Sequence, residues 1–157
     1  MELGGHAPVL IFDDCDLEKT LDMVVPQKFR NAGQVCVSPT RFLVQEGVYK
    51  DFVAQFVMHA EKLQVGNGMD AASSMGPLAN PRRMAAMQNL IADARQQHGQ
   101  VKTGGDRLGS SGNFWSPTVI TEMPTAARAM SEEPFGPMAL INPFATFDDA
   151  VREANRL

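Results

Sequence analysis

The feature that most constrains the fold is an alternation of two kinds of segment along the whole chain. Short apolar runs rich in branched residues predict buried strands, and longer segments with apolar residues at helical spacing predict helices. Strands that alternate with helices are typical of α/β proteins. The expected strands are 8–12, 41–45, 101–103, 115–122 and 138–141, and the expected helices are 16–31, 48–63, 80–94 and 147–155.

Several residues mark where these helices should begin or bend. Asp16 and Asn80 are suited to cap the first and third helices, because their side chains can accept hydrogen bonds from the first free backbone N–H groups. Thr146 or Asp148 can do the same for the last helix. Pro26 lies inside the first helical pattern and predicts a kink there.

Composition excludes several classes of protein. The 157 residues carry 14 basic and 18 acidic side chains, and the longest basic run is the pair Arg82 and Arg83, so we expect a small-molecule partner rather than nucleic acid. Apolar stretches stay well below the roughly 18 residues of a membrane span. Neither a signal peptide nor a disulfide framework is indicated, which predicts a cytoplasmic protein. His6, His59 and His98 lack metal-ligand spacing, and no metal is expected.

Cys36 is a candidate nucleophile because of the turn in which it lies. It follows Gly33 between a predicted helix and a predicted strand, and such a turn brings backbone N–H groups together where they can bind an oxyanion. The alternative is an inert buried thiol, since free cysteine is among the most buried residue types. Taken alone, the residues favour that alternative.

Three separated segments resemble the aldehyde dehydrogenase superfamily. They are Glu-Leu-Gly-Gly at 2–5, Gly-Gln-Val-Cys at 33–36 and Glu-Glu-Pro-Phe-Gly-Pro at 132–137. Their order and spacing carry the resemblance, because each segment by itself is common; 76–78 and 114–118 add to it. The resemblance implies an α/β catalytic domain with a layered sheet and helices packed on both of its faces.

The resemblance also implies a role for five residues. Cys36 would attack an aldehyde to give a thiohemiacetal, which loses hydride to NAD or NADP and leaves a thioester. Glu2 matches the general base that activates water for hydrolysis of that thioester. Glu133 matches the glutamate that binds the ribose next to nicotinamide, Phe135 the aromatic near that ring, and Leu3 a backbone carbonyl for the carboxamide. Without the resemblance, Glu2 and Glu133 are solvated charges and Phe135 belongs to the core.

Arg30 bears on the substrate. Residues 28–31, Lys-Phe-Arg-Asn, resemble the succinate-semialdehyde dehydrogenase branch and related enzymes for ω-carboxylated semialdehydes. An arginine six positions before Cys36 could hold a substrate carboxylate through two parallel hydrogen bonds. The alternative is a salt bridge to Glu18 or Asp22. A second cysteine found in part of that branch is replaced by Ser38, so no redox disulfide is expected.

The resemblance finally implies that residues 1–157 form only part of a catalytic domain. In the family, a cofactor-binding half and an asparagine oxyanion donor precede the 2–5 motif, and the oligomerisation strands follow the region matched here. We expect the parent enzyme to be a homo-oligomer and the isolated chain to turn over negligibly, since one lost oxyanion donor costs about 10²–10³ in rate. A non-catalytic structural or assembly fragment is the alternative.

Overall fold

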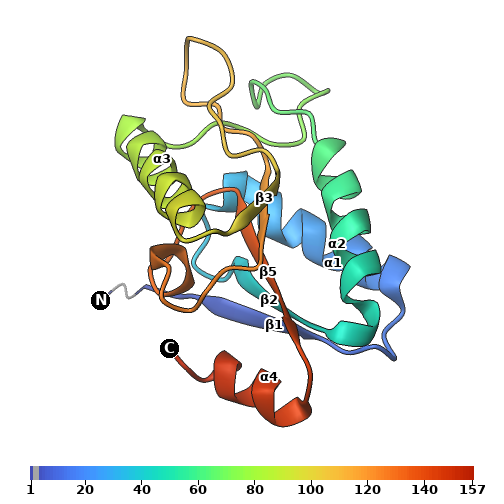
Figure 1. Ribbon diagram of the computed structural model, residues 1–157. Helices are drawn as coiled ribbons and strands as arrows, with labels where there is room; N and C mark the ends of the chain where they lie inside the picture. Colours follow the sequence, from blue (N-terminus) through green and yellow to red (C-terminus); the bar gives the residue numbers. More distant parts are fainter. Residues whose placement is uncertain (2–3) are drawn as a thin grey trace.

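A single five-stranded sheet organises the part of the chain that the computed structural model describes, residues 1 and 4–157 (Figure 1). The strand order is β1-β2-β5-β4-β3. The pairs β1–β2, β2–β5 and β5–β4 are parallel. The edge strand β3 pairs antiparallel with β4. The strands are β1 (Ala7–Ile11), β2 (Pro39–Gln45), β3 (Gln100–Thr103), β4 (Thr118–Thr121) and β5 (Met138–Phe144).

Helices cover both faces of this sheet, as expected for the α/β fold. Helices α1 and α2 pack against each other and against β2, α3 lies across β3 from α2, and α4 lies beneath β1 (Figure 1). In β2 the side chains of Phe42 and Val44 join the main core, while Leu43 joins a second cluster with Ala150 of α4. The helices are α1 (Leu17–Phe29), α2 (Glu46–Glu61), α3 (Pro81–Gln96) and α4 (Phe147–Ala154).

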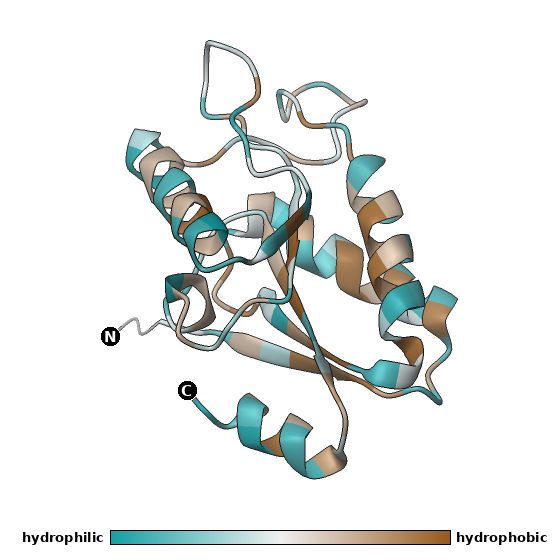
Figure 2. Ribbon diagram, viewed as in Figure 1, coloured by the Kyte–Doolittle hydropathy of each residue, from teal (hydrophilic) through white to brown (hydrophobic). Residues whose placement is uncertain are grey.

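The main core is aromatic where α2 meets β2. The rings of Phe42 and Phe56 meet edge to face with their centroids 5.0 Å apart, and Phe52 lies 5.7 Å from Phe56. All three side chains are fully buried, and burial of each stabilises the fold by about 2–3 kcal/mol. Figure 2 shows the matching pattern of apolar residues on α2 and the mostly hydrophilic α4.

The predicted N-caps of α1, α3 and α4 are confirmed, whereas α2 begins at Glu46 and not at residue 48. The Asp16 side chain accepts from the backbone N–H of Lys19 at 3.2 Å, and Asn80 caps α3 in the same way. Thr146 caps α4 and exchanges hydrogen bonds with Asp149 in a capping box, which leaves Asp148 as an ordinary first-turn residue.

Several element ends differ from the sequence-based expectation by one to three residues, among them both ends of α2 and the end of β5 at Phe144. Helix α1 continues through Pro26 but ends at Phe29, because Arg30 has a non-helical ψ of 132° and the residues after it adopt left-handed backbone. Strand β4 begins only at Thr118; Trp115, expected to lie in the strand, forms an isolated bridge with Arg107. The elements themselves lie where the apolar pattern predicts them.

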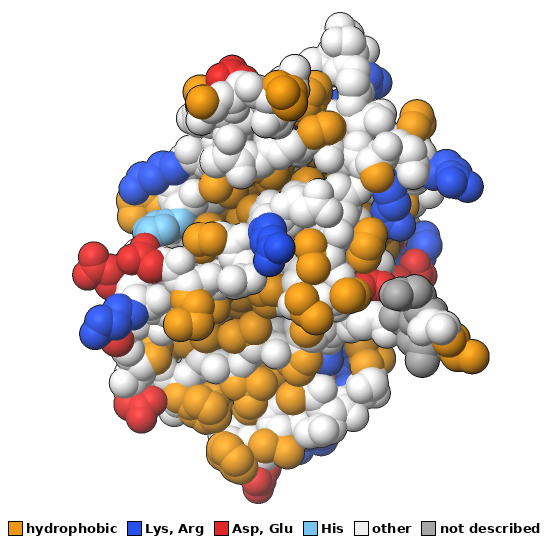
Figure 3. Space-filling model, turned by 180° about the vertical axis from the view of Figure 1, so that it is seen from behind, with side chains coloured by type: hydrophobic (Ala, Val, Ile, Leu, Met, Phe, Trp, Pro, Cys, Tyr) orange, Lys and Arg blue, Asp and Glu red, His pale blue; other side chains and the backbone are white. Residues whose placement is uncertain are grey.

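Apolar side chains remain on the surface as well as in the core. Figure 3 shows them gathered on the face behind the view of Figure 1. Among the larger exposed side chains are Met23, Val37 and Phe147. Within residues 1 and 4–157, every helix is too short or too polar to span a lipid bilayer.

Candidate active site

The turn that leads to Cys36 is built from left-handed backbone. Asn31, Ala32 and Gly33 have φ values of 51°, 53° and 69°. For Ala32 this conformation costs about 1–2 kcal/mol, whereas asparagine adopts it more readily because its side chain can form a local hydrogen bond. Hydrogen bonds oppose that cost: the Asn31 amide donates to the Gln34 carbonyl at 3.0 Å, and the Gln34 amide donates to the Asn31 carbonyl at 3.0 Å. Strain held in place by its surroundings is frequent at functional sites.

The same turn is fastened to two distant segments. The Gln34 side chain accepts a hydrogen bond from the backbone N–H of Ala79 at 2.8 Å. Gly33 lies so close to Gly136 that a Cβ on Gly33 would overlap the Gly136 carbonyl. Only glycine meets both this close approach and the positive φ. The position of Cys36 is therefore coupled to the 132–137 segment.

Cys36 opens onto a cavity of about 620 Å³. Its side chain is exposed, and the turn is closed behind it by a hydrogen bond from the Ser38 N–H to the Val35 carbonyl at 2.9 Å. Three motifs that are far apart in the sequence meet at this cavity. The lining residues are Gly4, Asn31, Gln34, Val35, Cys36, Glu133 and Phe135.

Glu133 lies beside the glycines of the first motif. Its Oε2 is 3.4 Å from the place that a Cβ on Gly4 would occupy, and Gly5 in turn approaches the Cys36 carbonyl, which a Cβ there would meet at 3.0 Å. The Glu133 side chain is half-buried. The structure thus places a carboxylate and a thiol on one cavity wall with backbone between them.

Lys28 is a buried cation beneath the Cys36 turn. Its side chain is fully buried, and Nζ donates to Ser38 Oγ at 3.3 Å. Burial lowers the pKa of Lys28 to about 7, and the negative charge of Glu133 opposes this shift. Among the described residues Lys28 forms no ion pair within 4.0 Å, so the charge of Glu133 favours the protonated amine from a longer distance.

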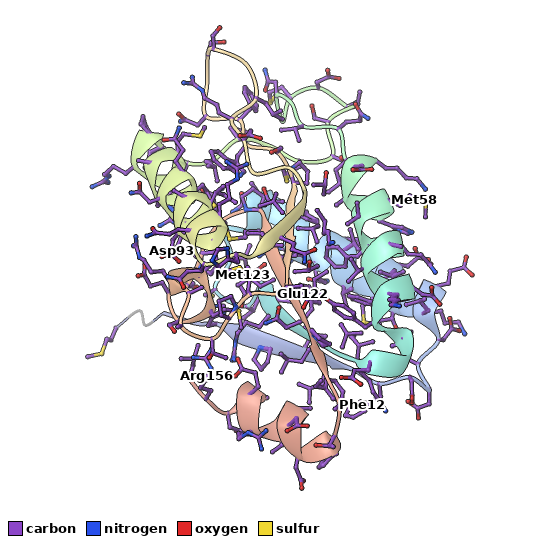
Figure 4. All side chains as sticks on the ribbon, viewed as in Figure 1. Phe12, Met58, Asp93, Glu122, Met123 and Arg156 are labelled. Atoms are coloured by element: carbon purple, nitrogen blue, oxygen red, sulfur yellow. The ribbon has the colours of Figure 1, made fainter. Side chains whose placement is uncertain are left out.

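The segment before the 132–137 loop is held from three sides. Asp93 of α3 accepts from the first N–H of the short helix η2 (Arg128–Met130) at 2.8 Å, and Arg156 after α4 donates to its last carbonyl at 2.7 Å (Figure 4). His6 donates to its middle carbonyl at 2.8 Å. Burial lowers the pKa of His6, which favours its neutral form.

The other predicted site residues are less directly placed. Arg30 is exposed and does not line the cavity, and within the described part of the chain it forms no ion pair with Glu18 or Asp22. The salt-bridge alternative for Arg30 is therefore not formed there. Glu2 and Leu3, predicted as base and cofactor contact, lie outside the described residues.

Three residues near the cavity were not singled out by the sequence analysis. Lys28 follows Leu21 and Val24 at helical spacing, so its place on the apolar stripe could have marked it as buried. Gln34 lies within the 33–36 motif, which the sequence analysis used without giving this residue a role. Arg83 contacts the 132–137 loop, and no pattern in the sequence predicts that contact.

Comparison with known proteins decides the family. The profile of the aldehyde dehydrogenase family matches residues 1–157. This chain belongs to that family. The resemblance found in the sequence, and the α/β catalytic-domain fold inferred from it, are thereby confirmed.

Individual relatives place the chain within the family. It is 45% identical over 154 residues to the probable succinate-semialdehyde dehydrogenase (NADP+) of Sinorhizobium fredii, covering 98% of the chain and 31% of that protein. It is 45% identical over 155 residues to 4-(hydroxymethyl)benzenesulfonate dehydrogenase TsaD1 of Comamonas testosteroni, covering 99% and 32%. The resemblance to the succinate-semialdehyde branch is confirmed.

A solved structure agrees with the fold throughout. A point mutant of betaine aldehyde dehydrogenase from Staphylococcus aureus, in complex with NAD+, superposes with a TM-score of 0.94 at 34% identity. The match covers 98% of this chain and 32% of that one. The chain therefore spans about a third of the length of the relatives it matches.

Proposed function

We propose that residues 1–157 carry the nucleophile and the nicotinamide end of the cofactor site in an NAD(P)-dependent aldehyde dehydrogenase. The observation that carries this proposal is the exposed Cys36 at the end of a strained turn, on one cavity with Glu133 and Phe135. A thiol in an open cavity can be reached by a small aldehyde, whereas a buried thiol cannot. The chain is part of a catalytic domain, and the parent enzyme is a homo-oligomer.

The chemistry begins at the Cys36 sulfur. The thiolate adds to the aldehyde carbon: a C–S bond forms, the C=O π bond breaks, and the oxygen of the thiohemiacetal takes the negative charge. Loss of hydride from that carbon to the bound cofactor would leave a thioester on Cys36. The Cys36 N–H has no acceptor among residues 1 and 4–157 and is free to donate to that oxygen. Glu2 is assigned to deprotonate the water that hydrolyses the resulting thioester.

The residues on the cavity fit a nicotinamide cofactor. A half-buried carboxylate such as Glu133 accepts hydrogen bonds from ribose hydroxyls, and the Phe135 ring offers a flat apolar face for the nicotinamide. Leu3 is assigned to the carboxamide. When bound, NAD or NADP accepts the hydride that leaves the substrate carbon. Relatives named for NADP+ or solved with NAD+ support either cofactor.

The preferred substrate is an aldehyde with an anionic group at its far end, such as succinic semialdehyde. Relatives named for succinate semialdehyde and for a benzenesulfonate support an anionic substrate. Arg30 is exposed and unpaired within the described residues, and its planar guanidinium suits a carboxylate or a sulfonate.

The substrate assignment is tested by Arg30→Gln in the protein at its natural length. We expect kcat/KM for succinic semialdehyde to fall about 100-fold, the order of one charge-assisted hydrogen-bonded pair, while an uncharged aldehyde of similar length loses less than threefold. Lys50→Gln, which removes another exposed cation, is the matched control. Equal losses on both aldehydes would contradict the role of Arg30.

The nucleophile is tested by alkylation with iodoacetamide across pH, mapped by mass spectrometry. Cys15 is half-buried and serves as an internal control. We expect Cys36 to react about tenfold faster or more, and Cys36→Ser to abolish NADH or NADPH formation where Cys15→Ser does not. Equal rates at both thiols would contradict a preorganised nucleophile. The 157-residue chain by itself should show negligible turnover, since it spans a third of its relatives.

A further inference from the structure

Arg83 of α3 contacts the loop that carries Glu133 and Phe135 at two points. Its Nη2 donates a hydrogen bond to the Pro134 carbonyl, and its guanidinium carbon lies 5.9 Å from the centroid of the Phe135 ring. A guanidinium over an aromatic face is attracted by the charge distribution of the ring. One side chain therefore holds two successive residues of the loop.

The loop needs such support because its backbone is strained. Phe135 has φ 42°, a conformation that is uncommon for a bulky residue and raises its free energy. The next residue, Gly136, packs directly on Met87 of α3, where a Cβ would overlap the methionine sulfur. On its other side Gly136 meets Gly33. The loop is thus enclosed between α3 and the Cys36 turn.

Arg83 is itself fixed in place. The Asn80 side chain caps α3 by accepting from the backbone N–H of Arg83 at 3.1 Å. The side chain is half-buried, its Nε has no partner among residues 1 and 4–157, and the hydrogen bond to Pro134 is the one that the guanidinium makes within that part of the chain. Burial lowers the pKa of Arg83, and the charge of Glu133 opposes that shift. Arginine remains charged throughout the physiological range.

We propose that Arg83 is a positioning residue that sets the Phe135 ring and the Glu133 carboxylate for the nicotinamide end of the cofactor. The inference rests on the proposed function, because it takes Glu133 and Phe135 to contact the cofactor. Arg83 acts through these two residues and not on the reacting atoms. Its loss should weaken cofactor binding and leave the chemistry of the bound complex almost unchanged.

The test compares Arg83→Met and Arg83→Lys with Arg82→Met in the protein at its natural length. Arg82 is the exposed neighbour on the same helical turn, so its loss removes the same charge without the loop contacts. For Arg83→Met we expect the KM for NAD+ or NADP+ to rise about tenfold, with kcat and the KM for aldehyde within about twofold. Arg83→Lys should restore only part of the loss, because an ammonium lacks the planar fork.

Hydrogen exchange of the segment 132–137 without cofactor gives a second readout. We expect faster exchange in Arg83→Met than in Arg82→Met. Unchanged cofactor KM with unchanged exchange would overturn the proposal. A joint decline of kcat, both KM values and thermal stability would also overturn it, since that pattern marks general destabilisation. Absence of dehydrogenase activity in the wild type would contradict the proposed function, whereas faster exchange in Arg83→Met would still support the hold of Arg83 on the loop.

Discussion

Helix α1 carries a cysteine-bearing turn at each end, and the two turns are built in different ways. At its start, Cys15 donates its N–H to the Phe12 carbonyl at 3.2 Å, and Asp16 caps the helix. None of residues 12–16 has a positive φ. At its end, three consecutive left-handed residues lead to Cys36. The backbone around Cys15 has conformations that its residues favour, whereas the backbone before Cys36 has left-handed conformations that most residues disfavour.

The difference shows where the stability of each turn comes from. The Cys15 turn is held by contacts within a few residues, and its thiol packs against the main core. The Cys36 turn is held by local hydrogen bonds between Asn31 and Gln34 and, in addition, by the distant partners Gly136 and Ala79. Cys36, at the turn with distant partners, is exposed on a cavity, whereas Cys15 packs against the core and is half-buried.

The largest expected effect comes from Gly33→Ala, which disrupts the close contact between the Cys36 turn and Gly136. The new Cβ would overlap the Gly136 carbonyl in a backbone of φ 69°, so we expect a loss of about 3 kcal/mol or more in the free energy of unfolding. Urea unfolding measures this loss. Alkylation of Cys36 should also slow towards that of Cys15, because the turn no longer holds its position.

Gly68→Ala is the control for that variant. Gly68 is exposed, and a Cβ there would meet nothing within 4 Å, so the change should stay within about 0.5 kcal/mol. If both alanine variants unfold at the same urea concentration, the close approach of Gly33 and Gly136 does not support the turn.

Lys28 provides an intermediate effect, visible as a pH dependence. Its pKa is about 7 in the folded protein and 10.5 as the reference for the unfolded chain, so the unfolded chain binds more protons between these values. The free energy of unfolding should therefore rise with pH across this window, by up to about 1.4 kcal/mol per pH unit from this group. Below pH 7 the contribution of Lys28 is constant, because the amine is charged in both states.

The measurement is urea unfolding at several pH values between 7 and 10 for the wild type and Lys28→Met. The variant should lose the pH-dependent rise that Lys28 produces, while Lys50→Met, an exposed lysine, should retain it. A rise of the same slope in Lys28→Met would show that the buried amine is not its source.

The smallest expected effect comes from Asp16→Ala, which removes the helix cap next to Cys15. Loss of the helix cap should lower the free energy of unfolding by about 1 kcal/mol. Alkylation of Cys15 should become faster and that of Cys36 should not change. Asp14→Ala removes a neighbouring exposed carboxylate that does not cap the helix, so it should change neither the free energy of unfolding nor the alkylation rate of Cys15. If Asp14→Ala lowers the free energy of unfolding as much as Asp16→Ala does, then charge and not capping stabilises this end of α1.

The same contrast explains what the sequence could predict. Strands, helices and caps follow from local patterns, and Asp16, Asn80 and Thr146 cap helices as their residue types indicate. The end of α1 at Phe29 was missed because left-handed backbone at Asn31 and Ala32 is opposed by local preference and is fixed by tertiary contacts. Motif order led to Cys36, Glu133 and Phe135, and the structure brings these onto one cavity.

The residues that support this cavity could not be found in the same way. Arg83 lies in an ordinary first helical turn, and nothing in its neighbours predicts a contact with Pro134. Lys28 is a partial exception, because its spacing from Leu21 places it on the buried stripe of α1. Such contacts depend on how helices lie across the sheet, which short-range patterns do not encode.

The pairing of β2 with β5 brings the Cys36 turn and the 132–137 segment together during folding. This pairing aligns Arg41 with Leu140 and joins strands that lie far apart in the sequence. Contacts between such distant segments close slowly during folding, and synthesis delivers the N-terminal part first. A chain that has grown only as far as β4 already contains Cys36 but has neither Glu133 nor Phe135. Cys36 is thus synthesised well before the 132–137 segment that completes its cavity.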